Sequence, residues 1–329
     1  MLTVIEGLGE NRQAQTNFAR IFQTKASRSD NLFIGWQGGS RQVQIYWSDE
    51  LKIWWSFRDN QDGVNKYWRA FGTNEPHWTG SYSHTIQSEI NSPFKGMSRR
   101  VAAGFVKDEE GRIFLVHRGN IGGGKKGVGK LLFFEHTHSR PCIVRDSAGD
   151  TDAVLVGELY SPRFCWQVAE FVHDIERIKK LTSVPRISSI GNQYYREYSG
   201  KKEYEVSQNI VADCDHGLVV DTMRRELESK GYHVANDRSR DLYILNNEKT
   251  EIKILFEFKT DSTPQNVYSA IGQLLFNSPV KQKPKLIAVF PDSISRQTLN
   301  RMIELNIQCI TYEWRKNRPY FRLLSQILK

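Results

Sequence analysis

Cysteine is scarce and scattered in this chain. Only 4 of the 329 residues are cysteine, and none forms a CxxC pair, which argues against a disulfide scaffold or a zinc ribbon. Long apolar runs are also missing, because the longest, such as Ile113–Val116 and Leu131–Phe134, are far shorter than the ~20 residues of a membrane-spanning helix. The amino terminus carries no basic stretch that leads into an apolar segment, so no secretion signal is expected. We therefore expect a cytoplasmic protein without a membrane partner.

Acidic residues are outnumbered by basic ones. The chain has 37 Asp and Glu against 46 Lys and Arg, for a formal net charge of +9. An excess of this size favours polyanionic partners, although it also fits a merely basic soluble protein. The hydrophobic fraction of 39% supports packed domains, and a chain of 329 residues is too long for one ordinary core. Two domains are the natural expectation.

Composition and periodicity divide the chain into three regions. Residues 1–181 hold 7 of the 8 tryptophans and many short strand-like runs, so we predict a β-rich (α+β) domain. Its last segment, Phe164–Leu181, has apolar residues at three- and four-residue spacing and is predicted to be a helix. Residues 182–212 break the pattern and are interpreted as a linker. Residues 213–329 alternate between helix-like and strand-like segments, which indicates an α/β domain.

The predicted elements of this last region follow a regular order. They are a helix at Gly217–Lys230, a hairpin of Asp241–Leu245 and Ile252–Lys259, a helix at Gln265–Asn277, a strand at Lys285–Phe290, a helix at Ser295–Leu305 and a strand at Gln308–Tyr312.

The hairpin carries the main candidate site. Asp241 is followed sixteen residues later by Glu257-Phe258-Lys259. Side chains alternate along a strand, so Glu257 and Lys259 project to one side while Phe256 and Phe258 point into the core. If the hairpin pairs as predicted, Asp241 lies close to both. Two carboxylates suit Mg²⁺, and an ammonium beside them suits the charge that develops during phosphodiester hydrolysis.

Simpler interpretations of these residues exist. A Glu-x-Lys pair on a strand is most often a solvated face with a weak ion pair. Asp237 and Asp261 are rival acids, and Asp241 is preferred because the sequence LYIL after it gives it a strand context.

The segments HGLVVDTMRRELESKGY, NDRSRDLYIL and IKILFEFKTD, with the helix AIGQLLF after them, resemble the PD-(D/E)XK restriction-endonuclease-like nucleases over about residues 215–315. The resemblance implies an αβββαβ core, a mixed sheet flanked by helices, with Asp241, Glu257 and Lys259 catalytic and the first two holding Mg²⁺. It also implies supporting roles for Gln273 and, on the first helix, Glu226. Arg240 stands where many members have proline, a departure that is common in the family. The implied function is restriction-type cleavage of double-stranded DNA by a homodimer.

A basic, glycine-rich loop is the second candidate site. Between Arg112 and Arg145 there are seven basic residues and one acid. Glycines let backbone amides approach a phosphate, so this stretch is predicted to contact the DNA backbone. The candidate contacts are Arg118, Lys125, Lys126 and Lys130. The loop also has the spacing of a nucleotide-binding P-loop, except for Leu131 in place of Ser or Thr. The sequence LLFFEH after it is predicted to be a strand, so the phosphate-binding helix N-terminus would be missing.

Aromatic residues of the N-terminal region allow two interpretations. Most tryptophans of a β-rich domain fill its core, but Trp54, Trp55 or Trp68 could instead stack on a flipped base. Modification-dependent restriction enzymes have a similar two-part layout, so the domain is expected to read either a modified base or a sequence in the major groove. His136 and His138 lack further ligands at supportive spacing and are predicted to make polar contacts.

Two other functions compete with the nuclease. One is a non-catalytic nucleic-acid-binding protein with an inert nuclease-like domain. The other is an ATP-using enzyme built on the glycine loop.

Overall fold

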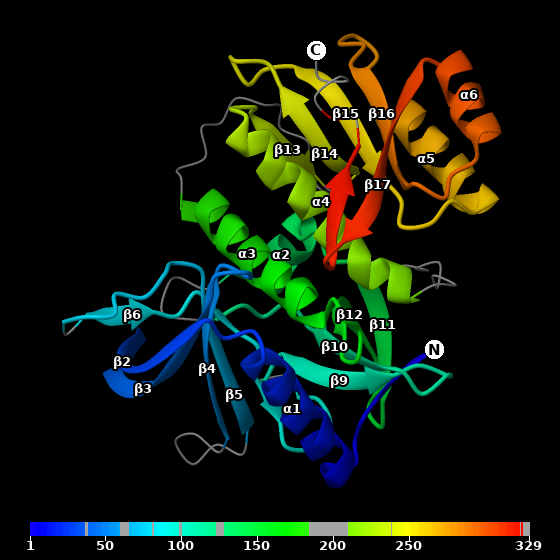
Figure 1. Ribbon diagram of the computed structural model, residues 1–329. Helices are drawn as coiled ribbons and strands as arrows, with labels where there is room; N and C mark the ends of the chain where they lie inside the picture. Colours follow the sequence, from blue (N-terminus) through cyan, green and yellow to red (C-terminus); the bar gives the residue numbers. More distant parts are fainter. Residues whose placement is uncertain are drawn as a thin grey trace.

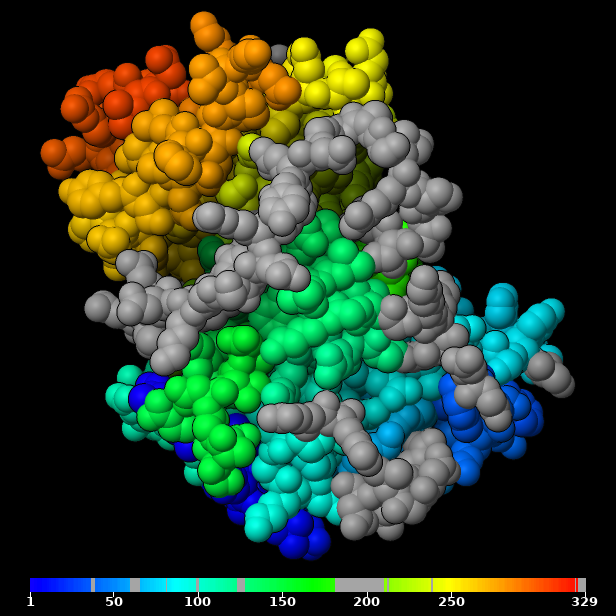
Figure 2. Space-filling view, turned by 180° about the vertical axis from the view of Figure 1, so that it is seen from behind, coloured from blue at the N-terminus to red at the C-terminus, as the bar shows by residue number. Residues whose placement is uncertain are grey.

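The computed structural model describes residues 1–36, 39–59, 66–80, 82–98, 101–122, 128–183, 210–237, 239–322 and 324. The chain forms two lobes, with residues 1–183 in one and most of the residues from 210 onward in the other (Figure 1). Figure 2 shows the same division from behind, with the blue and cyan segments at one end and the orange and red ones at the other. The fold is a mixture of helices and several sheets, as the sequence predicts at this coarse level.

The N-terminal lobe contains a seven-stranded sheet in the order β6-β2-β3-β4-β5-β7, with β8 paired to β5. Its strands are β2 (Arg28–Trp36), β3 (Gly39–Ser48), β4 (Ile53–Asp59), β5 (Lys66–Gly72), β6 (Ser83–Thr85), β7 (Ser88–Glu89) and β8 (Ser92–Pro93).

A small closed barrel completes the lobe, in the order β1-β11-β12-β10-β9. Its strands are β1 (Leu2–Val4), β9 (Ala103–Lys107), β10 (Ile113–His117), β11 (Pro141–Asp146) and β12 (Gly149–Glu158). Helices α1 (Leu8–Gln23) and α3 (Phe164–Ser183) share a core with both sheets. Helix α1 contributes Phe18 and Phe22 to that core, four residues apart and therefore on one face. The predicted helix at Phe164–Leu181 is confirmed as α3.

The three tryptophans proposed as base-stacking residues are core residues. Trp54 and Trp55 are each 1% exposed and Trp68 is 3% exposed. Trp54 and Trp55 are neighbours on β4 and therefore face opposite sides of the sheet, and both sides are covered. The stacking interpretation is therefore wrong for these residues, because none presents a ring face to solvent.

The segment after the glycine loop is a helix, and the strand prediction for it is wrong. Helix α2 spans Lys130–His136. Leu131 is 85% exposed and Phe133 is 0% exposed, whereas a strand would place these two side chains on one face. The run Leu131–Phe134 is apolar at every position, so the sequence shows neither a helical nor a strand period there. In the structure only Phe133 of this helix is buried. The helix removes one objection to a P-loop and leaves the mismatch at Leu131.

His117, at the end of β10, is a buried histidine whose titration is expected to affect stability. Burial lowers its pKa from the ordinary 6.5 to about 3. Between these values the unfolded chain takes up a proton that the folded protein excludes, so the free energy of unfolding should fall as the pH is lowered. The slope from this one group approaches ~1.4 kcal/mol per pH unit. Urea unfolding between pH 7 and 4 should show a shallower loss in H117L.

The matched control for this experiment is H233L, at the exposed His233 of the other lobe. It should keep the acid sensitivity of the unsubstituted protein. Equal acid sensitivity in H117L and the unsubstituted protein would show that His117 is not the group responsible.

The C-terminal lobe is built on a six-stranded mixed sheet in the order β13-β14-β15-β16-β17-β18. Strands β15, β16 and β17 are parallel to one another, and the remaining pairings are antiparallel. The elements are α4 (Ile210–Ser229), β13 (Val234–Asp237), β14 (Arg240–Leu245), β15 (Ile252–Phe258), α5 (Pro264–Asn277), β16 (Lys285–Pro291), α6 (Arg296–Glu304), β17 (Ile307–Arg315) and β18 (Arg318–Phe321).

Every element predicted for residues 213–329 is present, and the structure adds β13 and β18 at the two edges of the sheet. Helix α4 begins at Ile210, inside the region interpreted as linker; residues 184–209 of that region lie outside the described residues. Helix α4 covers one face of the sheet, and α5 and α6 cover the other. Helix α4 also packs against α3 and β12, so it joins the two lobes.

Candidate active site

Asp241 and Glu257 face each other across two neighbouring strands. Leu242 on β14 pairs with Phe256 on β15 in antiparallel register, so the next positions outward are Asp241 and Glu257. Phe256 and Phe258 pack beneath α4, as predicted from the alternation of side chains. Glu257 therefore projects from the opposite face, and Asp241 lies beside it at the end of the sheet where β15 terminates.

Lys259 completes the group, and α5 supplies a fourth member. The Lys259 ammonium is 2.8 Å from Glu257 Oε1 and donates to Gln273 Oε1 at 2.7 Å. Ser269, one turn earlier on α5, also donates to Gln273 Oε1 at 3.0 Å. The Lys259 backbone N–H is bonded to the carbonyl oxygen of Val289 at 2.9 Å, which fixes the chain just beyond β15. The ammonium is thus held from two sides, and the structure brings together Asp241, Glu257, Lys259 and Gln273.

Asp241 is anchored by contacts that the sequence did not indicate. Its Oδ2 accepts the backbone N–H of Phe258 at 3.0 Å, and its Oδ1 lies 3.4 Å from Nε2 of His216 on α4. Arg140, from the N-terminal lobe, approaches His216 Nδ1 at 3.1 Å. Because a guanidinium only donates, Nδ1 accepts and the ring proton is assigned to Nε2, facing Asp241. Both lobes therefore contribute to the site.

Burial and charge move the pKa values of these groups apart. Burial, and after it the charge of Asp241, raise the pKa of Glu257 to about 8. Burial alone would raise the pKa of Asp241, but His216, Arg140 and Lys259 outweigh it and hold that pKa well below its usual range. Burial lowers the pKa of His216 to about 4, so its ring is neutral at neutral pH. Two carboxylates that disfavour each other's charge are typical of a place that a cation can occupy.

Glu226 does not belong to this group, and its proposed catalytic role is wrong. It pairs at 2.8 Å with Lys230, the residue that follows the end of α4. The residue of α4 that reaches Asp241 is His216, and Glu226 lies ten residues further on, about 15 Å along a helix at ~1.5 Å per residue. The resemblance implies an acidic residue on the first helix and not a histidine. No signal in the sequence therefore pointed to His216.

The rival acids are engaged elsewhere. Asp237 is bound by Arg240 Nη1 at 2.6 Å. Asp261 Oδ1 accepts the Thr263 N–H at 3.0 Å and the Asn266 amide at 2.7 Å, at the start of α5. Neither side chain makes a hydrogen bond or ion pair with Glu257 or Lys259 among these contacts.

Of the basic residues predicted to contact DNA, Arg118 and Lys130 are described. Arg118 donates to Thr151 at 3.4 Å, and Lys130 lies 3.8 Å from Asp152. Both therefore lie near the start of β12. Lys125 and Lys126 lie outside the described residues.

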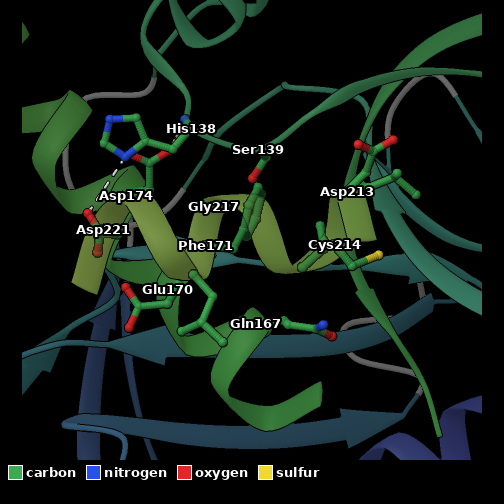
Figure 3. A pocket seen from close by; sticks show the side chains of 13 residues that line it. His138, Ser139, Gln167, Glu170, Phe171, Asp174, Asp213, Cys214, Gly217 and Asp221 are labelled. Atoms are coloured by element: carbon green, nitrogen blue, oxygen red, sulfur yellow. Dashed lines mark hydrogen bonds and ion pairs between the residues drawn. The ribbon is translucent and has the colours of Figure 1, made fainter. Parts of the chain in front are cut away.

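A cavity of about 10 Å³ lies between the lobes, with room for a single water at most, and its lining includes Ser139 and Gly217, the chain neighbours of Arg140 and His216 (Figure 3). His138 lies 3.6 Å from both Asp174 on α3 and Asp221 on α4, and so makes the polar contact that was predicted for it. Arg177 forms an ion pair with Asp174, and Arg224 forms one with Asp221. The cluster is a buried charge network that ties α3 to α4.

Within the described ranges, no group of three or more His, Cys, Asp or Glu side chains is arranged to hold a metal ion. The helices of the same ranges include none with the length and apolar character needed to span a membrane. Comparison of the chain with protein-family models, curated proteins and solved structures finds no match.

Proposed function

We propose that this protein is a Mg²⁺-dependent DNA endonuclease of restriction type, with its active site at the end of β14 and β15. The observation that carries the proposal is the convergence of Asp241, Glu257 and Lys259, with Gln273 holding the ammonium. The order of α4 to β17 contains the αβββαβ arrangement that the resemblance to PD-(D/E)XK nucleases implies.

The donor set fits Mg²⁺. This ion takes hard oxygen ligands, keeps several waters and is often held by only one or two carboxylates, so Asp241 and Glu257 suffice without a third side chain. A divalent cation between them would relieve the mutual repulsion that contributes to the raised pKa of Glu257. When bound, the ion would act as a Lewis acid toward the scissile phosphate.

The side chains of the chain itself would position and stabilise the reacting groups. Lys259, held by Glu257 and Gln273, presents N–H donors in a fixed direction, which suits the negative charge that develops on the phosphate oxygens. In the reaction one water oxygen forms a bond to phosphorus and one phosphoester bond breaks. The water gives up a proton, and the leaving oxygen takes one. His216 and Arg140 act through Asp241 and are positioning residues.

The basic N-terminal lobe is proposed to bind double-stranded DNA and to supply its specificity, for a sequence or for a modified base. Arg118 and Lys130 beside the barrel are candidate backbone contacts. Because each active site would cut one strand, the proposal includes a homodimer for double-strand cleavage.

Removing the metal tests the proposal directly. Purified protein should nick or linearise plasmid DNA in Mg²⁺ and show no cleavage in EDTA. The substrates should be unmodified, methylated and hydroxymethylated plasmids, because a modified-base reader would cut only one class. Retention of DNA in a gel shift without cleavage of any substrate would support the inert binding protein instead. ATP-dependent activity would point to the glycine loop.

A further inference from the structure

A groove of about 350 Å³ lies at the junction of α4 with the β17–β18 hairpin. Three arginines and a tyrosine make up most of its lining, which consists of Thr222, Arg225, Arg315, Arg318, Pro319 and Tyr320. In Figure 1 this hairpin, drawn in red, reaches from the upper lobe toward the lower one. The groove therefore lies where the lobes meet.

Two of the three arginines in the groove have carboxylate partners. Arg225 pairs with Glu170 and with Asp221, the latter at 3.7 Å, and Arg315 pairs with Glu313. Arg318 stacks 4.2 Å from the ring centre of Trp166 and, among the described residues, has no carboxylate within ion-pair distance. Burial and then the nearby Arg318 lower the pKa of Arg225 to about 10, which reflects two cations held close together.

The side chains around Arg318 are arranged for an anion. Arg315 stacks on Tyr320, with 3.6 Å from its guanidinium to the ring centre, so that guanidinium is held in place. The Thr222 hydroxyl oxygen is buried and has no hydrogen-bond partner in the described part of the chain. Guanidinium groups held in place by aromatic rings are suited to phosphate oxygens, which accept several hydrogen bonds at once.

The groove shares one end of the sheet with the candidate active site. Strands β15 to β17 are parallel, so Lys259 and Arg315, each at a C-terminal strand end, lie at the same edge. The Tyr312 hydroxyl approaches the Lys259 carbonyl oxygen at 3.4 Å, and Arg315 follows three residues later. His216, which reaches Asp241, and Arg225 of the groove lie nine residues apart on α4, about 13 Å along the helix at ~1.5 Å per residue. One strand of DNA covers that distance in a few nucleotides, since each advances ~3.4 Å along the duplex axis.

We infer that this groove binds a backbone phosphate of the DNA strand that enters the active site, a few nucleotides from the bond that is cut. Arg318 is the principal contact, with Arg225 and Arg315 beside it. The inference rests on the proposed function for the identity of the partner. It adds a contact surface on the nuclease lobe itself, apart from the basic residues of the barrel.

The experiment compares R318A with R296A, which removes the same charge from exposed Arg296 on α6. Binding of a fluorescent duplex is measured by anisotropy in EDTA at several salt concentrations, so that cleavage plays no part. R318A should bind about tenfold more weakly at low salt, and the slope of log K against log salt should fall by about one. R296A should match the unsubstituted protein, and R318K should lie between.

The salt slope separates a phosphate contact from a structural effect, because lost packing against Trp166 would not change the number of ions released. An unchanged affinity and slope in R318A would overturn the inference. So would stabilisation by inorganic phosphate that R318A abolishes while DNA binding stays unchanged, which would make the groove a site for free phosphate.

The failure of this inference is distinguishable from that of the proposed function. If the protein cuts no DNA but R318A still lowers the salt slope, the groove binds a DNA phosphate and the nuclease proposal fails. If the protein cuts DNA and R318A binds normally, only the groove is wrong.

Discussion

Replacing Lys259 with alanine should lower the rate of Mg²⁺-dependent DNA cleavage by about 10²- to 10³-fold, or ~3–4 kcal/mol of transition-state stabilisation. The reason is geometric: its ammonium is fixed between Glu257 Oε1 at 2.8 Å and Gln273 Oε1 at 2.7 Å, beside both carboxylates. Single-turnover cleavage of a defined duplex measures the effect, and anisotropy in EDTA should show DNA binding within a few-fold of normal.

Lys253 provides the matched control for this substitution. It lies on β15, the strand that leads to Lys259, is exposed and pairs with Glu251, so K253A removes the same group from outside the site. K253A should cleave at the normal rate. Equal rates for K259A and the unsubstituted protein would falsify the assignment of Lys259, and E257Q and D241N would then be needed to learn whether the carboxylates act without it.

Replacing Asp221 with alanine should lower the free energy of unfolding by ~3 kcal/mol. Asp221 is 1% exposed and lies 2.6 Å from Arg224, 3.7 Å from Arg225 and 3.6 Å from His138. Removing one partner of a buried ion pair leaves the other charge buried without compensation, which typically costs about 3–5 kcal/mol. The lower end is expected here, because Arg224 keeps Glu228 and Arg225 keeps Glu170. Urea unfolding followed by tryptophan fluorescence measures the change.

The control for this variant removes the other carboxylate that binds the same arginine. Glu228 contacts Arg224 at the same 2.6 Å, but its side chain is 46% exposed, so E228A should cost less than ~1 kcal/mol. A similar loss in both variants would show that burial of Asp221 does not determine its contribution. DNA cleavage measured at low temperature should change little in either, because neither carboxylate belongs to the candidate active site.

Local sequence patterns predicted the C-terminal lobe well. The alternation of residues 252–259 predicted Phe256 and Phe258 in the core and Glu257 on the other face, and the structure confirms that arrangement. The strands β13 and β18 were missed because edge strands are short and half exposed, so they carry little hydrophobic period. The helix α2 was misassigned for a related reason, since four consecutive apolar residues fit a strand as well as a helix.

The tryptophans show what composition leaves open. Trp54, Trp55 and Trp68 have the same side chain whether they stack on a base or fill a core, and only the packing of α1, the sheet and the barrel decided for the core. Glu226 and Lys230, by contrast, stand four residues apart, a spacing at which the sequence alone favours an ion pair.

The sequence by itself determined the alternation of helix and strand after residue 213 and the pairing of Glu257 with Lys259, because both follow from the two-residue period of a strand. Only the tertiary structure decided that His216 and Arg140 hold Asp241, and that Arg318 lies in a groove at the same end of the sheet. Arg140 and His216, for example, are 76 positions apart in the sequence. Contacts of that range depend on how the lobes pack, and no local pattern in the chain specifies it.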